Sequence, residues 1–219
     1  MTPSERAVAV FDRLDPLYPD KSPLLEYSSP FELLIAVILS AQTTDAQVNR
    51  VTPELFRRFP TPQALAAAEP AEVETLIFST GFYRAKARNI RAAARAFAEQ
   101  YAGELPCTMA ELTGIPGVGR KTANVLLGVL CGRPSIVVDT HFGRVVRRIG
   151  FTTARQPDRV ERELAAIVPA EIRTELSMAL NFHGRYVCTS RNPACFRCPI
   201  ADLCLFEEKT SAPQTEDIP

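Results

Sequence analysis

The sequence predicts an all-α protein, and three features of the chain support this prediction. Apolar residues recur three or four positions apart along most of the 219 residues, which is the spacing of a buried helix face. Prolines fall between these apolar runs, where they can begin a helix or end a loop. The only stretch that resembles a strand is SIVVD at 135–139, which is too short to build a sheet. Typical helix lengths then predict roughly ten helices.

The helices follow from runs of apolar residues, taken here in chain order. The runs contain Val8, Phe11 and Leu14; Leu34, Val37 and Ile38; Ile90, Ala94 and Phe97; Leu126, Leu127 and Leu130; and Leu176, Ala179 and Leu180. The separating prolines are Pro30, Pro53, Pro62, Pro70, Pro106, Pro134, Pro157 and Pro169. The segment after Tyr186 is rich in cysteine and predicts a second, smaller unit. The polar tail after Lys209 predicts disorder.

Charge and hydropathy narrow the class of protein. The 25 basic and 25 acidic residues cancel, so bulk charge predicts no polyanionic partner. Basic residues nevertheless gather locally, at 84–95, 144–148 and 185–197, which predicts a basic face on a neutral protein. No apolar run approaches the ~18 residues of a membrane span, and the N-terminus lacks the apolar core of a signal peptide. We therefore expect a cytoplasmic protein.

Four of the six cysteines crowd the C-terminal end in the pattern C-x6-C-x2-C-x5-C. They are Cys188, Cys195, Cys198 and Cys204. In a reducing compartment, four thiols at this spacing predict a soft metal site. Structural zinc usually has two closely spaced cysteine pairs, whereas here only the middle pair is close, so the spacing favours an iron–sulfur cluster over zinc without excluding zinc. Cys107 and Cys131 adjoin apolar runs and are predicted to be small buried residues.

The stretch GIPGVGRKTANVLLGVL at 114–130 has the composition of a phosphate-binding loop but matches no nucleotide motif. Arg120 stands where a P-loop needs lysine, and Thr122 stands where a dinucleotide loop needs its third glycine. We predict two helices joined by a tight hairpin, with Gly117 and Gly119 in the turn. The amides that begin the second helix then attract an anion, such as a nucleic-acid phosphate. An ordinary helix connection with a glycine cap is the alternative.

Two residues near this hairpin have the chemistry of a catalytic pair. Lys121 lies in the first turn of the second helix, where the helix dipole is expected to lower its pKa and make it a better amine nucleophile. Asp139 precedes the next helix and is predicted to be its N-cap. A carboxylate held in this way can also stabilise positive charge that develops on a sugar ring.

Five segments together carry a resemblance to a known family. LSAQTTD, GIPGVGRKTANVLLG, VDTHFGRV, HGRYVC and the cysteine tail resemble, in this order, the endonuclease III family of helix-hairpin-helix DNA glycosylases. The resemblance implies a [4Fe–4S] cluster on the four cysteines and an active-site cleft between two domains. It implies a six-helix domain at 23–133 with its helix-hairpin-helix at about 108–131. The cluster domain would comprise 134–209 and the N-terminal helix at 1–22, followed by a disordered tail at 210–219.

The resemblance also assigns roles to individual residues. Lys121 corresponds to the nucleophilic lysine and Asp139 to the essential aspartate. Gln42 corresponds to a glutamine that fills the gap left by an extruded nucleotide, and Phe82 stands where the family commonly has a leucine wedge, so the damage preference is open. The residues expected to contact DNA are Gln42, Phe82, Gly117, Gly119, Arg120, His141, Arg144 and Arg191. For His141, a bond within its own helix is an equal alternative.

The resemblance implies excision of oxidised or ring-saturated pyrimidines from duplex DNA, followed by strand cleavage through a lysine Schiff base. The expected partner is double-stranded DNA with damaged bases or abasic sites, bound by a monomer in the nucleoid. One alternative is a glycosylase for mismatched adenine, which lacks a lysine at the position of Lys121. The other is a DNA-binding module without catalytic activity, in which changes at Lys121 and Asp139 have no effect.

Overall fold

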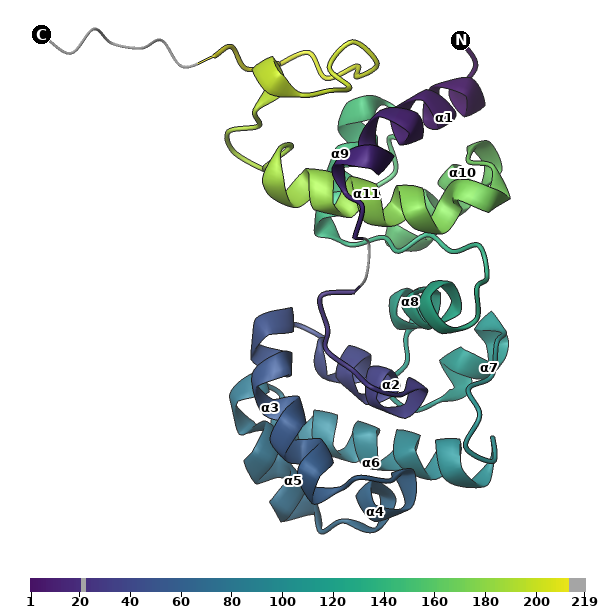
Figure 1. Ribbon diagram of the computed structural model, residues 1–219, viewed down its shortest axis with the longest axis vertical. Coiled ribbons are helices and arrows are strands. Elements are labelled where there is room, and N and C mark those ends of the chain that lie inside the picture. The colour runs from purple at the N-terminus through teal and green to yellow at the C-terminus, as the bar shows by residue number, and fades with distance from the viewer. Residues whose placement is uncertain (21–22, 213–219) are drawn as a thin grey trace, which may run out of the picture. The chain divides into compact units, whose positions relative to one another are not determined.

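The computed structural model describes residues 1–20 and 23–212, and all regular structure in these residues is helical (Figure 1). These residues form eleven α-helices, close to the ten predicted, and SIVVD is extended backbone that joins no sheet within them. The all-α prediction is confirmed. The chain divides into two compact units: a middle unit of residues 23–133, and a terminal unit of residues 1–20 with 134–212.

The middle unit contains α2 (Pro30–Leu39), α3 (Asp45–Arg58), α4 (Pro62–Ala67), α5 (Pro70–Ile77), α6 (Tyr83–Glu99), α7 (Met109–Gly114) and α8 (Arg120–Leu130), with the 3₁₀ turn η2 (Phe78–Thr80). The terminal unit contains α1 (Pro3–Leu14), α9 (Thr140–Ile149), α10 (Pro157–Ile167) and α11 (Arg173–Tyr186), with the 3₁₀ turns η1 (Asp15–Leu17), η3 (Ala170–Ile172) and η4 (Cys195–Arg197). The described part of the middle unit thus has seven α-helices where six were predicted, and α4 and α7 are only six residues long.

Several helices begin as their sequences predict, with a hydroxyl cap followed by proline. The pairs are Thr2–Pro3, Ser29–Pro30 and Thr61–Pro62, and in each the cap oxygen accepts the amide three residues on at 3.2 Å. Such a cap contributes about 1 kcal/mol. Pro53 is the exception, because it lies inside α3 and not between helices. The buried side chains around it, Val51, Thr52 and Leu55, favour continuing the helix despite the backbone hydrogen bond that proline cannot donate.

Helix α2 is the centre of the middle unit. Its residues from Leu33 to Leu39 are all buried, as is Phe31. A helix that is apolar on every side is stable only when other helices surround it, and α2 packs against α3, α6 and α8. The apolar run FELLIAVIL at 31–39, which is too short to cross a membrane, is therefore the core of this unit. None of the described helices is long and apolar enough to cross a membrane.

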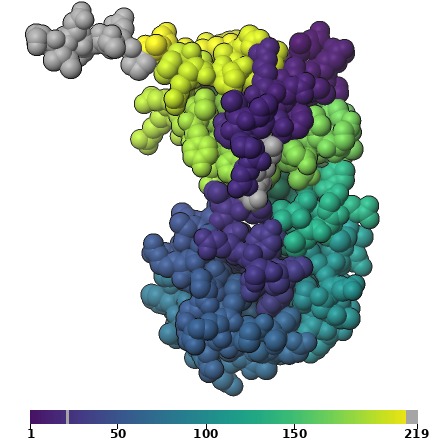
Figure 2. All heavy atoms as spheres, in the orientation of Figure 1, coloured from purple at the N-terminus to yellow at the C-terminus, as the bar shows by residue number. Residues whose placement is uncertain are grey.

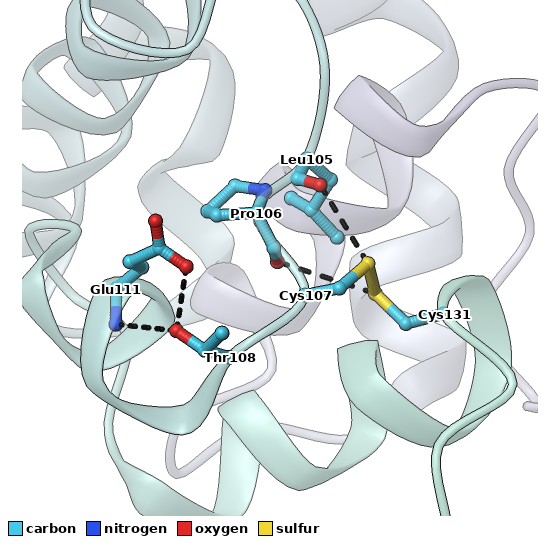
Figure 3. The surroundings of a disulfide bond; sticks show 6 residues. All are labelled: Leu105, Pro106, Cys107, Thr108, Glu111 and Cys131. Atoms are coloured by element: carbon cyan, nitrogen blue, oxygen red, sulfur yellow. Dashed lines mark hydrogen bonds between the residues drawn. A yellow bond between two sulfur atoms is a disulfide. The ribbon is translucent and has the colours of Figure 1, made fainter.

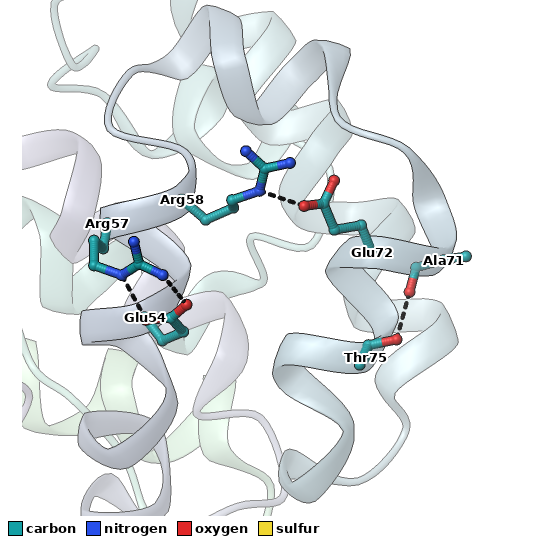
Figure 4. A network of polar contacts seen from close by, with 6 residues as sticks. All are labelled: Glu54, Arg57, Arg58, Ala71, Glu72 and Thr75. Atoms are coloured by element: carbon teal, nitrogen blue, oxygen red, sulfur yellow. Dashed lines mark hydrogen bonds and ion pairs between the residues drawn. The ribbon is translucent and has the colours of Figure 1, made fainter.

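Ion pairs lie on the outer surface of α3 and α5 (Figure 4). Arg58 of α3 binds Glu72 of α5, and within α3 Arg57 binds Glu54 through two nitrogens, at 2.5 and 2.7 Å. All four side chains are more than a third exposed. Exposed pairs contribute at most about 1 kcal/mol each, so the apolar core dominates the stability of this unit.

Cys107 and Cys131 form a disulfide, and the prediction that they are small buried residues is wrong (Figure 3). Both are only partly buried. Cys107 precedes Thr108, the N-cap of α7, and Cys131 ends α8, so the bond joins the two ends of the predicted helix-hairpin-helix. The sequence alone did not reveal this pairing because 24 residues separate the two cysteines and only the fold of the hairpin brings them together.

The terminal unit joins the two ends of the chain in one core. Figure 2 shows α1, in purple, lying against the green and yellow C-terminal residues. Ala7, Val10 and Leu14 of α1 belong to the same apolar cluster as residues of α9, α10 and α11. Gly184 allows α9 and α11 to approach closely, because a Cβ at that position would lie 3.0 Å from His141 Cβ and from Val145 Cγ2.

The predicted disordered tail falls largely on residues 213–219, which lie outside the described residues. Of residues 210–212, Thr210 has a structural role, since its hydroxyl oxygen accepts a hydrogen bond from the amide of Cys195 at 3.2 Å.

Candidate functional site

The hairpin between α7 and α8 is built around two buried apolar residues, Ile115 and Val118, and closed by a hydrogen bond from the Val118 amide to the Ile115 carbonyl. Gly117 has φ of +83°, and a Cβ there would lie 2.9 Å from Ile38 of α2 and from Asn89 of α6. Gly117 is therefore required for both the turn and its packing. Gly119 has extended backbone that any residue can adopt, and no heavy atom lies within 4 Å of the place for its Cβ. The space beside Gly119 is therefore open, and the residue is exposed at the start of α8.

Lys121 is the second residue of α8 and is exposed to solvent. The helical period places Ala123, Leu126 and Leu127 in the core, so Arg120 and Lys121 lie on the outer side of the helix. The first turn of α8 contains no acidic residue. Backbone amides, the helix dipole and two cationic side chains thus combine at one helix end, which is an arrangement that attracts an anion.

Asp139 is the N-cap of α9, as predicted. Its Oδ1 accepts the amide of Phe142 at 2.7 Å. The extended segment before it is fixed by α11, because the amide of Val137 donates to Ser177 Oγ at 2.9 Å and the amide of Ser135 donates to Thr174 Oγ1 at 3.2 Å. The carboxylate therefore has a defined position at the start of α9.

Cys188, Cys195, Cys198 and Cys204 line one cavity of the terminal unit, of about 390 Å³ including space open to solvent. Apolar residues, among them Val145, Ile149 and Ile200, complete its wall. Burial raises the pKa of Cys198 to about 11 and also raises that of Cys204, so thiolates at this site require nearby positive charge. Within residues 1–20 and 23–212, no three cysteine, histidine or acidic side chains converge closely enough to hold a single metal ion. Four thiols that line one cavity instead fit an iron–sulfur cluster, in which each iron binds one thiolate.

The remaining predicted DNA contacts fall into two groups. Gln42 and Phe82 lie in exposed loops of the middle unit, and Arg191 is exposed between the first two cysteines of the metal site. Arg144 is partly buried and donates to the carbonyls of Gly184 at 2.7 Å and Cys188 at 3.0 Å, and His141 Nδ1 lies 3.4 Å from the same guanidinium. The structure thus gives His141 and Arg144 contacts within the terminal unit, and their contact with DNA stays a prediction.

Residues 35–170 match the HhH-GPD superfamily of base excision DNA repair proteins, and residues 188–204 match the iron–sulfur binding domain of endonuclease III. Endonuclease III of Synechocystis sp. is 46% identical to this chain over 204 residues, covering 91% of this chain and 92% of that protein. The chain belongs to the endonuclease III family. Two solved structures support this, a non-covalent endonuclease III–DNA complex and a trapped endonuclease III–DNA covalent intermediate. Each is 42% identical with a TM-score of 0.85, and they cover 93% of this chain and 95% and 96% of theirs.

Membership of the endonuclease III family decides between the two metals that the cysteine spacing left open. The matched iron–sulfur domain begins at Cys188 and ends at Cys204, and it implies a [4Fe–4S] cluster on the four cysteines. When bound, the cluster cross-links the segment that follows α11 and supplies a compact positive charge to the buried thiolates.

Two further side chains support the cysteines, and the first of them, Arg148, was not predicted to do so. Arg148 donates to Cys188 Sγ at 3.3 Å and to the carbonyls of Thr189 at 2.6 Å and Ser190 at 2.9 Å, so it holds the loop that contains Arg191. Its position four residues after Arg144, on the same face of α9, is the signal in the sequence.

His183 is the second of these supporting side chains. It is buried and its Nε2 lies 3.4 Å from Cys198 Sγ, while the Tyr18 hydroxyl lies 3.3 Å from Nδ1. Burial lowers the pKa of His183 to about 4, so the ring is neutral and carries one N–H. If Tyr18 donates to Nδ1, that N–H faces the sulfur.

Proposed function

We infer that this chain is a base-excision-repair enzyme that acts on DNA, with DNA glycosylase and apurinic/apyrimidinic (AP) lyase activities. The observation that carries this inference is Lys121, an exposed amine at the start of α8 in a chain of the endonuclease III family. A mismatch-adenine glycosylase lacks this lysine, and a module that only binds DNA does not need it.

The hairpin is the proposed phosphate contact. The exposed amides beside Gly119 and the side chain of Arg120 bind backbone phosphate without reading sequence. A base inside a duplex is inaccessible, so the damaged nucleotide must rotate out of the stack, which costs a few kcal/mol. Gln42 and Phe82 then occupy the gap, where an aromatic ring stacks against the bases that remain.

Lys121 performs the chemistry. Its neutral Nζ attacks C1′ of the extruded nucleotide, and the base leaves with the electrons of the glycosidic bond. Asp139 stabilises the positive charge that develops on the sugar. The Nζ lone pair then expels the ring oxygen O4′, which takes up a proton, and a protonated Schiff base forms between Nζ and C1′. This Schiff base acidifies the C2′ proton, and loss of this proton expels the 3′ phosphate by β-elimination. Both residues belong to one chain, so the proposed mechanism requires only a monomer.

The proposed substrates are oxidised or ring-saturated pyrimidines and abasic sites. Damaged bases stack and pair poorly, so the cost of extrusion is lowest for them. Phe82 changes the wedge from the leucine common in the family to a larger, flat ring, which is expected to affect which opposite base is tolerated.

Borohydride trapping on a duplex with one thymine glycol tests this function. Reduction of the Schiff base converts it into a stable covalent protein–DNA adduct, which is expected for the wild type and absent for Lys121→Ala. Arg120→Ala is a matched control one residue away; it should bind DNA more weakly yet still form the adduct at saturating protein. Failure of folded, DNA-binding wild type to form an adduct would overturn the lyase assignment. Trapping that persists in Lys121→Ala would identify another nucleophile.

A further inference from the structure

Gln42 and Phe82 share an unusual backbone conformation. Their φ angles are +54° and +48°, and within residues 1–20 and 23–212 the only other non-glycine residue with positive φ is Ala102. A left-handed conformation costs a non-glycine residue roughly 1–2 kcal/mol. Such strain persists only where the surrounding structure holds the residue in place. Both are exposed, and Phe82 is 68% exposed. Whatever holds these two residues must therefore act on the loops beneath them.

The loops that carry Gln42 and Phe82 meet at one atom, the carbonyl oxygen of Thr80. The Thr43 hydroxyl donates to this oxygen at 2.6 Å from the first loop. Lys86 Nζ donates to the same oxygen at 2.8 Å from the first turns of α6. Thr80 is only 1% exposed, so water does not compete readily for these bonds. Thr43 is the direct neighbour of Gln42, and Thr80 lies two residues before Phe82.

A second hydrogen bond connects the same two parts of the chain, α3 with the loop before it and η2. Gln47 of α3 donates from Nε2 to the hydroxyl of Ser79 at 2.6 Å. The Thr80 hydroxyl also donates to the carbonyl of Ile77 at 2.8 Å, which fixes η2 on the end of α5. The two exposed loops therefore behave as one connected element.

Lys86 is the most informative member of this element. The sequence placed it in a basic face with Arg84, Arg88, Arg91 and Arg95, and this placement is wrong. These four arginines recur at helical spacing along one side of α6, whereas Lys86 is offset from them and is 4% exposed. Burial lowers the pKa of Lys86, and a buried ammonium is costly unless it is well bonded. Its bond to the Thr80 carbonyl is the partner that the structure gives it.

We propose that Thr43 and Lys86 are positioning residues that lock the Gln42 and Phe82 loops together through the Thr80 carbonyl, so that both side chains enter the duplex gap as one unit. The proposal rests on the proposed function, since it assumes that these two residues occupy the gap left by an extruded nucleotide. It adds residues that need not touch DNA.

The test compares Thr43→Val with Thr43→Ser on the full-length protein. Valine keeps the shape of threonine and removes the donor, whereas serine keeps the donor. The duplex carries a tetrahydrofuran abasic analogue opposite 2-aminopurine, whose fluorescence rises when the base is unstacked by an inserted side chain. This readout requires no chemistry. Single-turnover excision of thymine glycol and binding of undamaged duplex are measured in parallel.

We expect Thr43→Val to lose most of the fluorescence change and to slow excision by about tenfold, the effect of one lost buried hydrogen bond. Thr43→Ser should stay within about twofold of wild type, and all variants should bind undamaged duplex alike. Lys86→Met, which replaces the ammonium by a chain of similar length, should resemble Thr43→Val. If Lys86→Met does not fold, the Thr43 pair alone decides.

Two results would overturn the proposal. One is a Thr43→Val protein with wild-type insertion and excision. The other is an equal loss in Thr43→Val and Thr43→Ser, which would mean that side-chain size and not the hydrogen bond matters. A wild type that inserts into the analogue but neither excises nor traps would overturn the proposed function and leave the loop junction to be judged by fluorescence.

Discussion

Gly117→Ala is expected to destabilise the middle unit because two separate requirements meet at this position. Its φ is +83°, a conformation that an L side chain rarely adopts. The new methyl group would lie 2.9 Å from Ile38 Cγ2 and 2.9 Å from Asn89 Cβ. Neither neighbour can easily move, since Ile38 is 2% exposed in the core of the unit and the Asn89 atom is a Cβ fixed to the backbone of α6.

The size of the effect follows from these two contributions. A left-handed alanine costs roughly 1–2 kcal/mol, and overpacking a fixed site costs about 1–3 kcal/mol. Together they predict a loss of about 2–5 kcal/mol in the free energy of unfolding. This is a large fraction of the roughly 5–15 kcal/mol that stabilises a typical domain.

Urea unfolding followed by circular dichroism measures this loss, with two glycines of the same hairpin as controls. Gly114 and Gly119 have no heavy atom within 4 Å of the place for a Cβ, and neither has a positive φ. Alanine should be neutral or slightly stabilising at Gly114, which ends α7, and should cost at most about 1 kcal/mol at Gly119. Gly119→Ala should instead weaken DNA binding. If Gly117→Ala unfolds at the same urea concentration as Gly114→Ala, the reasoning from backbone and packing is refuted.

Three further predictions concern the proposed catalytic carboxylate, the disulfide and the N-terminal helix. Asp139→Asn keeps a good helix cap, so its free energy of unfolding should lie within about 0.5 kcal/mol of that of wild type. Its rate of excision should nevertheless fall at least tenfold, and a rate equal to that of wild type would show that the negative charge is not needed. Replacing Cys107 and Cys131 by serine removes a cross-link that spans 24 residues, which should cost about 3–4 kcal/mol by the loop-entropy relation. Dithiothreitol should lower the urea midpoint of wild type but not that of the double variant. A midpoint that changes neither with dithiothreitol nor with the serine substitutions would exclude a stabilising disulfide. Arg13 donates to Asp202 and holds the pKa of this carboxyl below its usual value. The pair therefore stabilises the fold above that usual value and loses its effect as the pH falls through the lowered pKa. Asp202→Asn, which leaves the bond from Arg13 to the Pro199 carbonyl in place, should show a small loss in the free energy of unfolding at neutral pH that disappears in acid, and a constant difference would exclude this linkage.

Much of the fold could be predicted because its causes are local. Hydroxyl residues followed by proline begin α1, α2 and α4, and apolar spacing identifies the buried faces. Pro53 was misplaced because the rule that proline ends helices ignores the stabilisation that a long apolar face gives to α3. The disulfide and the Thr80 junction were not predicted because both join residues that only the tertiary fold brings together.

The candidate site shows the same division between local and long-range causes. Asp139 could be predicted as an N-cap because capping depends on the three residues that follow. The exposure of Lys121 follows from the helical period, which places it on the side of α8 opposite the buried residues Ala123, Leu126 and Leu127. The support of these residues could not be predicted, because Ser177 fixes the segment before Asp139 from 40 residues away. The particular partners of His183 were not predicted either, because Tyr18 and Cys198 come from two distant segments.

The two hairpin glycines separate structural from functional requirements. Both belong to the same motif, and the sequence alone does not distinguish the role of one from that of the other. Gly117 is needed by the fold, because its backbone angle and its contacts with α2 and α6 leave no room for a side chain. Neither of these constraints applies to Gly119, since its backbone is extended and its surroundings are open. A residue that the fold does not need, placed directly before exposed amides and two cations, is best explained by what must approach it. That partner must come close to the backbone and carry negative charge, as a DNA phosphate does.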